Sequence, residues 1–189
     1  MNYREMYRYV LDKTDKQEQD RQTDNIIHTA INAGYIDVSK HDATPNEVNI
    51  SPIARVNALP EDFLIELAVY HNSYGLLDES QYRVSGNKLL LANNVILYNK
   101  PSDFIEGNNL DSIDVVYGVM PELLKEDEDI PVVNEQYHMA ICYYALYEIT
   151  NNPNYHNLYT NIIQLIPQFE LFTDDASSDE YVRDVVKRW

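Results

Sequence analysis

The stretch from Ile130 to Asn152 constrains the fold more than any other part of the chain. It has neither glycine nor proline between Glu135 and Ile149, and Asn134 is a residue type that caps helices by accepting hydrogen bonds from free backbone N–H groups. Apolar side chains occur nearly all the way around the helix that this stretch would form, so most of its faces must be buried. The sequence therefore predicts a helix that lies either in the core of its own domain or against a neighbouring subunit.

Helical periodicity also occurs on both sides of this stretch. It predicts a short helix over residues 3–11, a second that starts at Thr23, and a last one for which Asn152 and Pro153 suit the N-cap and the first turn. The expected apolar stripes are Met6, Tyr7, Val10 and Leu11 in the first helix, Ile27, Ala30, Ile31, Tyr35 and Val38 in the second, and Tyr155, Leu158, Tyr159, Ile162, Ile163 and Ile166 in the last.

Two residues interrupt these helical patterns. Gly34 lies inside the apolar stripe of the second helix, where glycine costs about 1 kcal/mol relative to alanine. Close packing against another helix would explain its presence. Pro167 is expected to kink or end the last helix, because proline cannot donate the backbone hydrogen bond that a helix interior needs.

Between the helices the periodicity changes to that of β-strands. The segment Leu64–His71 alternates, with Ile65, Leu67 and Val69 predicted on one face, and it follows a turn over residues 59–63. Ser85-Gly86-Asn87 between apolar runs predicts a hairpin over residues 82–91. Further short strands are expected within residues 46–59, at 95–98 and at 113–117.

These elements predict an α+β fold, a helical bundle formed by N- and C-terminal helices with an inserted small β-rich domain. The expected boundaries are residues 1–45 and 122–173 for the helical domain and 46–121 for the β-rich insertion. Residues 122–129 are expected to form an acidic hinge, and residues 174–189 a C-terminal docking tail.

The charge of the chain excludes several classes of function. Its 189 residues carry a formal net charge of −17, which disfavours a protein that grips nucleic acid, since such proteins displace counterions from phosphates with lysine and arginine. The same charge disfavours binding to an anionic membrane surface. No apolar run approaches the roughly 20 residues that cross a bilayer. The single cysteine, Cys142, cannot form an internal disulfide and fits a reducing compartment.

No motif for catalysis or for a cofactor occurs in the sequence. The five histidines lack the spacing of a metal site, and no phosphate-binding or hydrolase motif is present. Cys142 with His138, one helical turn apart, is the one nucleophile–base pair, and it lacks an evident carboxylate to orient the histidine. The sequence thus predicts a protein that is not an enzyme and that needs no cofactor and no metal.

Several short motifs follow one another in order over residues 1–165, and together they resemble the head–tail adaptor (connector) proteins of tailed bacteriophages. After a short N-terminal helix come Asp24-Asn25-Ile26-Ile27, Ala30-Ile31-Asn32-Ala33-Gly34-Tyr35, Leu59-Pro60-Glu61-Asp62-Phe63, Tyr82-Arg83-Val84, Val116-Tyr117 with Pro121, Asp129-Ile130-Pro131, Tyr137-His138-Met139-Ala140 and Tyr143-Tyr144-Ala145-Leu146-Tyr147.

This resemblance implies a structural virion protein of the neck, present in the host cytoplasm before assembly. Its expected partners are the portal protein, the tail (nozzle or hub) protein and further copies of itself in a homo-oligomeric, usually twelvefold ring. The ring would join the portal to the tail and extend the channel, through which DNA passes without sequence-specific binding and without a membrane being involved. The alternative is a small regulatory or ligand-binding domain that uses the β insertion.

Three features suggest where such a protein makes contacts. Tyrosine is common at interfaces, so Tyr143, Tyr144 and Tyr147 are expected to meet a neighbouring subunit, the alternative being ordinary core. Part of the acidic set is expected to line the channel and repel DNA, the alternative being a solvated outer surface.

The C-terminal segment is expected to dock on the portal. Asp174, Asp175, Asp179 and Glu180 make an acidic linker, and the nine residues after it are too few to hold a helix in water unaided. The alternative is a disordered tail. The residues expected to make the portal contact are Tyr181, Val182, Val185, Val186, Arg188 and Trp189.

Overall fold

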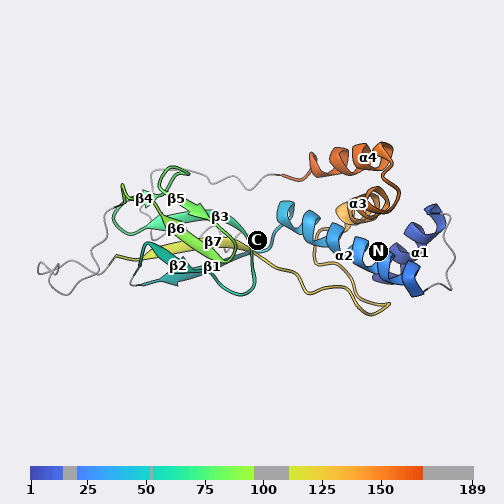
Figure 1. Ribbon diagram of the computed structural model, residues 1–189, viewed down its shortest axis with the longest axis horizontal. Helices are drawn as coiled ribbons and strands as arrows, with labels where there is room; N and C mark the ends of the chain where they lie inside the picture. Colours follow the sequence, from blue (N-terminus) through green and yellow to red (C-terminus); the bar gives the residue numbers. More distant parts are fainter. Residues whose placement is uncertain (15–20, 52, 96–110, 168–189) are drawn as a thin grey trace, which may run out of the picture. The chain divides into compact units, whose positions relative to one another are not determined.

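The computed structural model describes residues 1–14, 21–51, 53–95 and 111–167 (Figure 1). Two compact units are distinguished by their internal contacts, one from Met1–Ala43 with Met120–Gln168 and the other from Thr44–Val119. The helices are α1 (Tyr3–Lys13), α2 (Arg21–His41), the 3₁₀ turn η2 (Glu135–Tyr137), α3 (His138–Thr150) and α4 (Pro153–Ile163). The strands are β1 (Pro45–Ile50), β2 (Val56–Ala58), β3 (Phe63–His71), β4 (Gly75–Leu76), β5 (Tyr82–Val84), β6 (Lys88–Leu91) and β7 (Ile113–Val119).

The predicted organisation of the α+β fold is wrong, although the class itself is α+β. The described part of the chain has four α-helices and two separate antiparallel sheets, and the helices are scattered along the chain with strands between them. They do not form a bundle of N- and C-terminal helices that flanks one small insertion; the last described helix ends at Ile163. The reason is that periodicity identifies the type of each element but not which elements share a sheet or a core.

The helices of the first unit share one apolar core. The predicted stripe of α2 is buried along its whole length, and α3 contributes the fully buried Ile141, Cys142 and Leu146. Asn2 caps α1 through a capping box with Glu5, and Asn152 caps α4 by accepting a hydrogen bond from the Asn154 N–H, with Pro153 in the first turn as predicted.

Gly34 allows α2 and α3 to approach each other closely. A Cβ atom at this position would lie 2.8 Å from the Ile141 carbonyl oxygen and 3.2 Å from the Tyr144 Cβ. The oxygen belongs to the backbone of α3 and cannot move aside as a flexible side chain could. The close helix packing predicted from Gly34 is therefore confirmed.

Residues 120–134, here called the strap, contain neither strand nor α-helix and are hydrogen-bonded to side chains of α2 and of Asp42 just after it. The Asn32 side chain donates to the Leu124 carbonyl at 3.0 Å and accepts from the Leu124 N–H at 2.8 Å. The Tyr35 hydroxyl accepts from the Val132 N–H at 3.0 Å, and Asp42 accepts from the Asn134 N–H at 2.6 Å. These bonds satisfy backbone groups that a segment without secondary structure would otherwise leave unpaired.

The acidic turn of the strap also completes the start of α1. The N–H groups of Tyr3 and Arg4 donate to the carbonyls of Asp129 and Asp127, at 2.7 and 3.1 Å. These are first-turn groups that have no partner within the helix. The Asp129 carboxylate accepts from the backbone N–H groups of residues 125 and 126, which lowers its pKa.

The second unit is built from the two sheets. One has the strand order β1-β7-β3-β4 and the other β2-β6-β5, with antiparallel pairing throughout. The hairpin between β5 and β6 is confirmed, and Gly86 at its turn has φ +56°, where a side chain would be strained. The buried core of this unit comprises Ile53, Leu59, Val69, Leu77, Leu89, Leu91, Val95, Ile113, Val115 and Tyr117.

The predicted face of β3 is wrong. Ile65, Leu67 and Val69 were expected on one side, but the pairing of β3 with β7 shifts register between Phe63 and Ile65 and again between Glu66 and Ala68. Each irregularity breaks the two-residue alternation. Val69 consequently packs in the main β core, whereas Leu67 packs with a separate small cluster.

Replacing Gly34 with alanine should destabilise the protein by about 1 to 3 kcal/mol, the usual cost of overpacking a core. The clash with the Ile141 carbonyl outweighs the gain in helix propensity of about 1 kcal/mol. Chemical denaturation measures the change. Asn25→Ala, on an exposed face of the same helix, provides the control because it raises propensity without a clash. A Gly34→Ala protein as stable as the wild type would contradict the prediction.

Candidate interaction surface

Tyrosine rings join α3 to α4. The ring of Tyr143 stacks on Tyr155 with centroids 6.5 Å apart, and Tyr144 meets Tyr159 edge to face at 5.4 Å. Tyr147 lies 5.0 Å from the ring of His156. Such pairs contribute roughly 0.5 to 1.5 kcal/mol beyond the burial of their area. They hold α4 in place even though none of its own residues is fully buried.

A hydroxyl–carboxylate hydrogen bond adds a second link, from α4 to α2. Tyr159 donates to Asp37, whose other oxygen lies 3.3 Å from the Lys40 ammonium. Burial, and after it the contact with Asp37, raises the pKa of Tyr159. The hydroxyl therefore stays protonated at neutral pH and remains a donor.

The three tyrosines predicted to meet a neighbouring subunit lie together at this junction. Tyr143, Tyr144 and Tyr147 are each partly buried by contacts within their own subunit, and each keeps part of its ring accessible. Their packing partners are residues of α4, together with Tyr9 of α1 for Tyr143 and the backbone of α2 at Gly34 for Tyr144. Whether they also contact a second copy stays a prediction.

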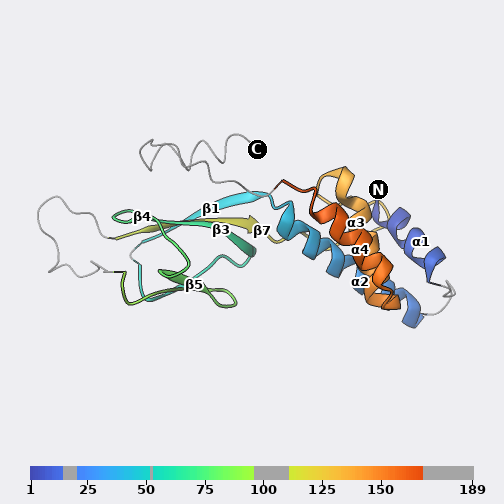
Figure 2. The same cartoon turned by 90° about the horizontal axis from the view of Figure 1, so that it is seen from above.

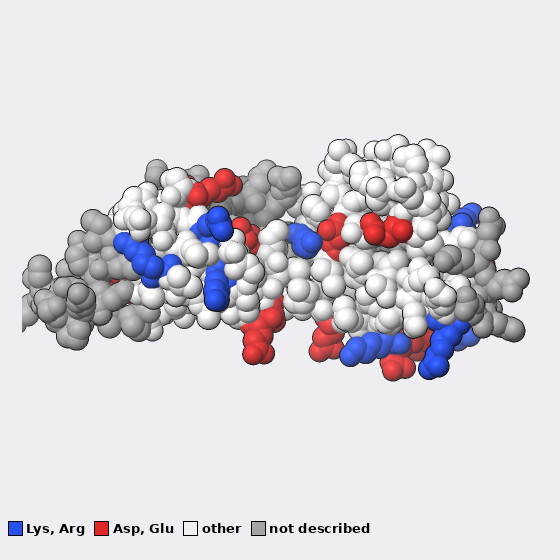
Figure 3. Space-filling model, viewed as in Figure 1, with Lys and Arg blue, Asp and Glu red and all other residues white. Residues whose placement is uncertain are grey.

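The outer surface of α4 is free of charge in a chain that carries −17. No Asp, Glu, Lys or Arg occurs between Thr150 and Pro167, and the surface over α4 in Figure 3 shows neither acidic nor basic side chains. Leu158 was expected to be buried in the apolar stripe but is 41% exposed, and Leu165 is 75% exposed. We call this surface the α4 face; it comprises Asn154, Asn157, Leu158, Asn161, Gln164 and Leu165.

A second exposed apolar surface lies on the strap. Ile130 is 66% exposed and Val132 is 72% exposed, whereas the alternate residues Pro131 and Val133 are buried. The buried pair anchors the backbone, so that the two β-branched side chains are held outward. We call Ile130 with Val132 the strap ridge.

The cysteine–histidine pair is not arranged for catalysis. Cys142 is fully buried, and burial raises the pKa of its thiol to about 12. Both ring nitrogens of His138 are engaged, Nδ1 with the Met1 ammonium at 2.8 Å and Nε2 with the Val133 carbonyl at 3.0 Å. The thiol is therefore protonated at neutral pH, and the histidine serves as a buried structural link.

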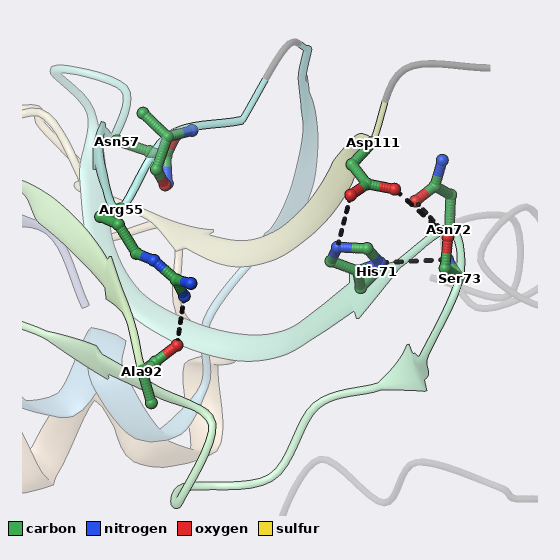
Figure 4. A network of polar contacts seen from close by, with 8 residues as sticks. Arg55, Asn57, His71, Asn72, Ser73, Ala92 and Asp111 are labelled. Atoms are coloured by element: carbon green, nitrogen blue, oxygen red, sulfur yellow. Dashed lines mark hydrogen bonds and ion pairs between the residues drawn. The ribbon is translucent and has the colours of Figure 1, made fainter. Parts of the chain in front are cut away.

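A buried polar network in the second unit also has a structural geometry (Figure 4). The His71 Nδ1 accepts from the Ser73 backbone N–H at 3.0 Å, which leaves the ring proton on Nε2, 3.9 Å from Asp111. The Ser73 hydroxyl donates to Asp111 at 3.2 Å and not to the histidine. The histidine is thus not placed to take a proton from the hydroxyl, and burial lowers the pKa of His71 despite the opposing effect of Asp111.

Metal-ligating side chains do not gather anywhere in the described residues, where no group of three or more His, Cys, Asp or Glu side chains could hold a metal ion. Within the same residues, none of the helices has the length and apolar character to cross a membrane. The portal-docking residues predicted from the sequence lie outside the described part of the chain: Tyr181, Val182, Val185, Val186, Arg188 and Trp189.

The α4 face and the strap ridge were both missed as candidate surfaces in the sequence. Helical spacing placed Leu158 in a core stripe, but spacing cannot show which apolar direction is covered by protein. Signals for both surfaces were present: the uncharged run from Thr150 to Pro167, and the apolar residues around Pro131 directly after an acidic run.

Replacing Tyr159 with phenylalanine should loosen α4 by about 1 kcal/mol, the usual net value of one hydrogen bond. The ring stays in place while the link to Asp37 is lost. Hydrogen exchange of the α4 amides measures the loosening. Tyr147→Phe is the control, since it removes a hydroxyl from the same helix pair without touching Asp37. Equal protection in the wild type and Tyr159→Phe would contradict the role of this bond.

The free energy of unfolding should fall as the pH drops below about 6.5, because the unfolded state protonates its His71 first. The folded state resists this protonation, since burial lowers the pKa of His71. His71→Gln should flatten this part of the pH dependence, and His41→Gln, at an exposed position, should not. Denaturation curves between pH 7 and 5 test the difference; an unchanged slope in His71→Gln would contradict it.

Comparison with known proteins identifies the family. The chain matches the family model described as SU10 adaptor protein over residues 1–184, and no curated protein matches it. The match confirms the resemblance to head–tail adaptors that the order of motifs indicated. Because the matched range is nearly all of the 189 residues, the chain belongs to the SU10 adaptor protein family, whose members have a structural role at the head–tail junction of phages, in contact with portal and tail components.

Proposed function

We propose that the chain forms the head-to-tail adaptor ring, which joins the portal to the tail and extends the DNA channel. The family match carries this proposal. The uncharged α4 face supports it, because a chain with a net charge of −17 can pack against its own copies only where like charges do not meet. We propose twelve copies in the ring, the usual number for adaptors that the chain resembles.

The helical unit is proposed to make the contacts between subunits. Tyr143, Tyr144 and Tyr147 keep part of their rings accessible beside the α4 face. Aromatic residues at the edge of an uncharged surface are typical of interfaces, whereas charged residues are depleted at interface cores. Addition of a neighbouring copy is therefore expected to reduce the accessible area of these rings.

The ring is proposed to act by geometry and not by catalysis. The protonated thiol of Cys142 and the fully engaged His138 support the absence of a turnover activity. Part of the acidic set is proposed to line the channel, where it would repel DNA and prevent it from sticking during passage. The neck of the virion is the proposed location, after assembly from the host cytoplasm.

The segment of residues 174–189 is proposed to dock on the portal through Tyr181, Val182, Val185, Val186, Arg188 and Trp189. Tryptophan and arginine are enriched among residues that dominate binding energy. The acidic residues before the segment would keep it soluble until the portal is present.

Deleting residues 176–189 should give a folded, soluble subunit that no longer joins portal rings. Co-purification with the portal protein of the same phage, together with negative-stain microscopy, measures the loss. In the full-length chain, Val185→Asp with Val186→Asp should have the same effect, and Asp179→Asn with Glu180→Gln should have none. Normal joining by the truncated protein would refute the docking role.

A further inference from the structure

The helical unit presents two surfaces with exposed apolar side chains, the α4 face and the strap ridge, on opposite sides of α2. The strap is bonded to Asn32 and Tyr35 of α2 and to Asp42 just after its last residue, whereas α4 is bonded to Asp37. At about 100° per residue, Asn32 and Tyr35 lie about 220° and 160° around the helix from Asp37, on nearly the opposite side. Figure 1 shows the same arrangement, with α4 packed on α3 on one side of α2 and the strap on the other, and Figure 2 shows these helices from above.

The two surfaces differ in composition and in the element that carries them. The strap ridge is a pair of outward β-branched side chains, Ile130 and Val132, both more than half exposed. The α4 face is a helix surface with Leu158 and Leu165 exposed between amide side chains. Contact between the two surfaces would remove the apolar area of the ridge and of the exposed leucines from water.

Charge also favours this pairing. The residues before the ridge, Glu126 to Asp129, are acidic, so two straps brought together would repel each other. The α4 face carries no acidic residue. The amide groups of its asparagine side chains can donate hydrogen bonds to nearby carboxylates. The acidic strap of one copy can therefore approach the α4 face of a second copy without repulsion from charged residues of α4.

We propose that the strap ridge of one copy packs on the α4 face of the next copy. This contact is heterologous: each copy uses its strap ridge toward one neighbour and its α4 face toward the other. The same contact therefore repeats from copy to copy. When the rotation between copies closes, the product is a ring, and the proposal therefore rests on the ring-forming function proposed above. The occupant of each surface is in both cases another copy of this chain.

Engineered disulfides test the proposal. The native Cys142 is fully buried, so cysteines introduced at Val132 and Leu158 are the accessible ones. The doubly substituted Val132→Cys, Leu158→Cys protein should give a ladder of covalent oligomers after oxidation, on a denaturing gel without reductant. A mixture of the two single variants should stop at dimers, because each molecule then carries only one usable side. Either single variant alone should stay monomeric.

The matched control is Lys13→Cys with Leu158→Cys, which places the first cysteine at an exposed position at the end of α1. It should give no ladder. Oxidation is carried out on the protein alone at high concentration and on the protein assembled with portal rings. A ladder from the Val132 and Leu158 pair in either sample supports the contact, and its absence in both overturns it. Dimers from a single variant would show a self-complementary contact and would also overturn it.

The outcome is separable from that of the ring function. Wild-type protein that joins portal rings, while the assembled double variant gives no ladder, leaves the adaptor ring standing and removes this contact. Wild-type protein that does not join portal rings, while the double variant forms a ladder on its own, removes the portal role and keeps the contact between copies.

Discussion

The close approach of α2 and α3 at Gly34 is the constraint on which the helical unit depends. It brings Tyr144 against α2. It also positions the tyrosines of α3 that pack against α4. The Asp37 hydrogen bond then fastens α4 to the same helix. On the other side of α2, Asn32 fastens the strap. The helix α2 thus holds the strap directly and helps to hold α4, which packs on α3.

The sequence was informative where local chemistry decides the structure. Asn152 with Pro153 marked a helix start, Gly86 marked a hairpin, and Gly34 marked a close helix contact, because each position admits few other residue types. Strand pairing was not predictable, since it depends on partners far apart in the chain. The register shift at Glu66 and Ala68 shows this: one extra residue reverses the faces predicted by alternation.

The candidate surfaces were predictable only in part. The tyrosines of α3 were identified from residue type, and the structure places them beside α4 with part of each ring exposed. The exposure of Leu158 was not predicted from the sequence, because its spacing is that of a core residue. Only the three-dimensional packing shows which side of α4 is covered. The uncharged run that contains it was visible in the sequence, and its meaning depends on the charge of the rest of the chain.

Tyrosine explains how such an acidic chain keeps carboxylates close to its cores. With 31 acidic and 14 basic residues, cations cannot pair with every carboxylate, and tyrosine hydroxyls act as neutral donors instead. They join α1 to α2 through Tyr7 and Asp24, α4 to α2 through Tyr159, and β7 to the turn before β3 through Tyr117 and Asp62, the last at 3.1 Å. A neutral donor satisfies a carboxylate without cancelling its charge. The acidic surface therefore keeps its negative charge, and only uncharged places such as the α4 face could meet another copy without contact between like charges.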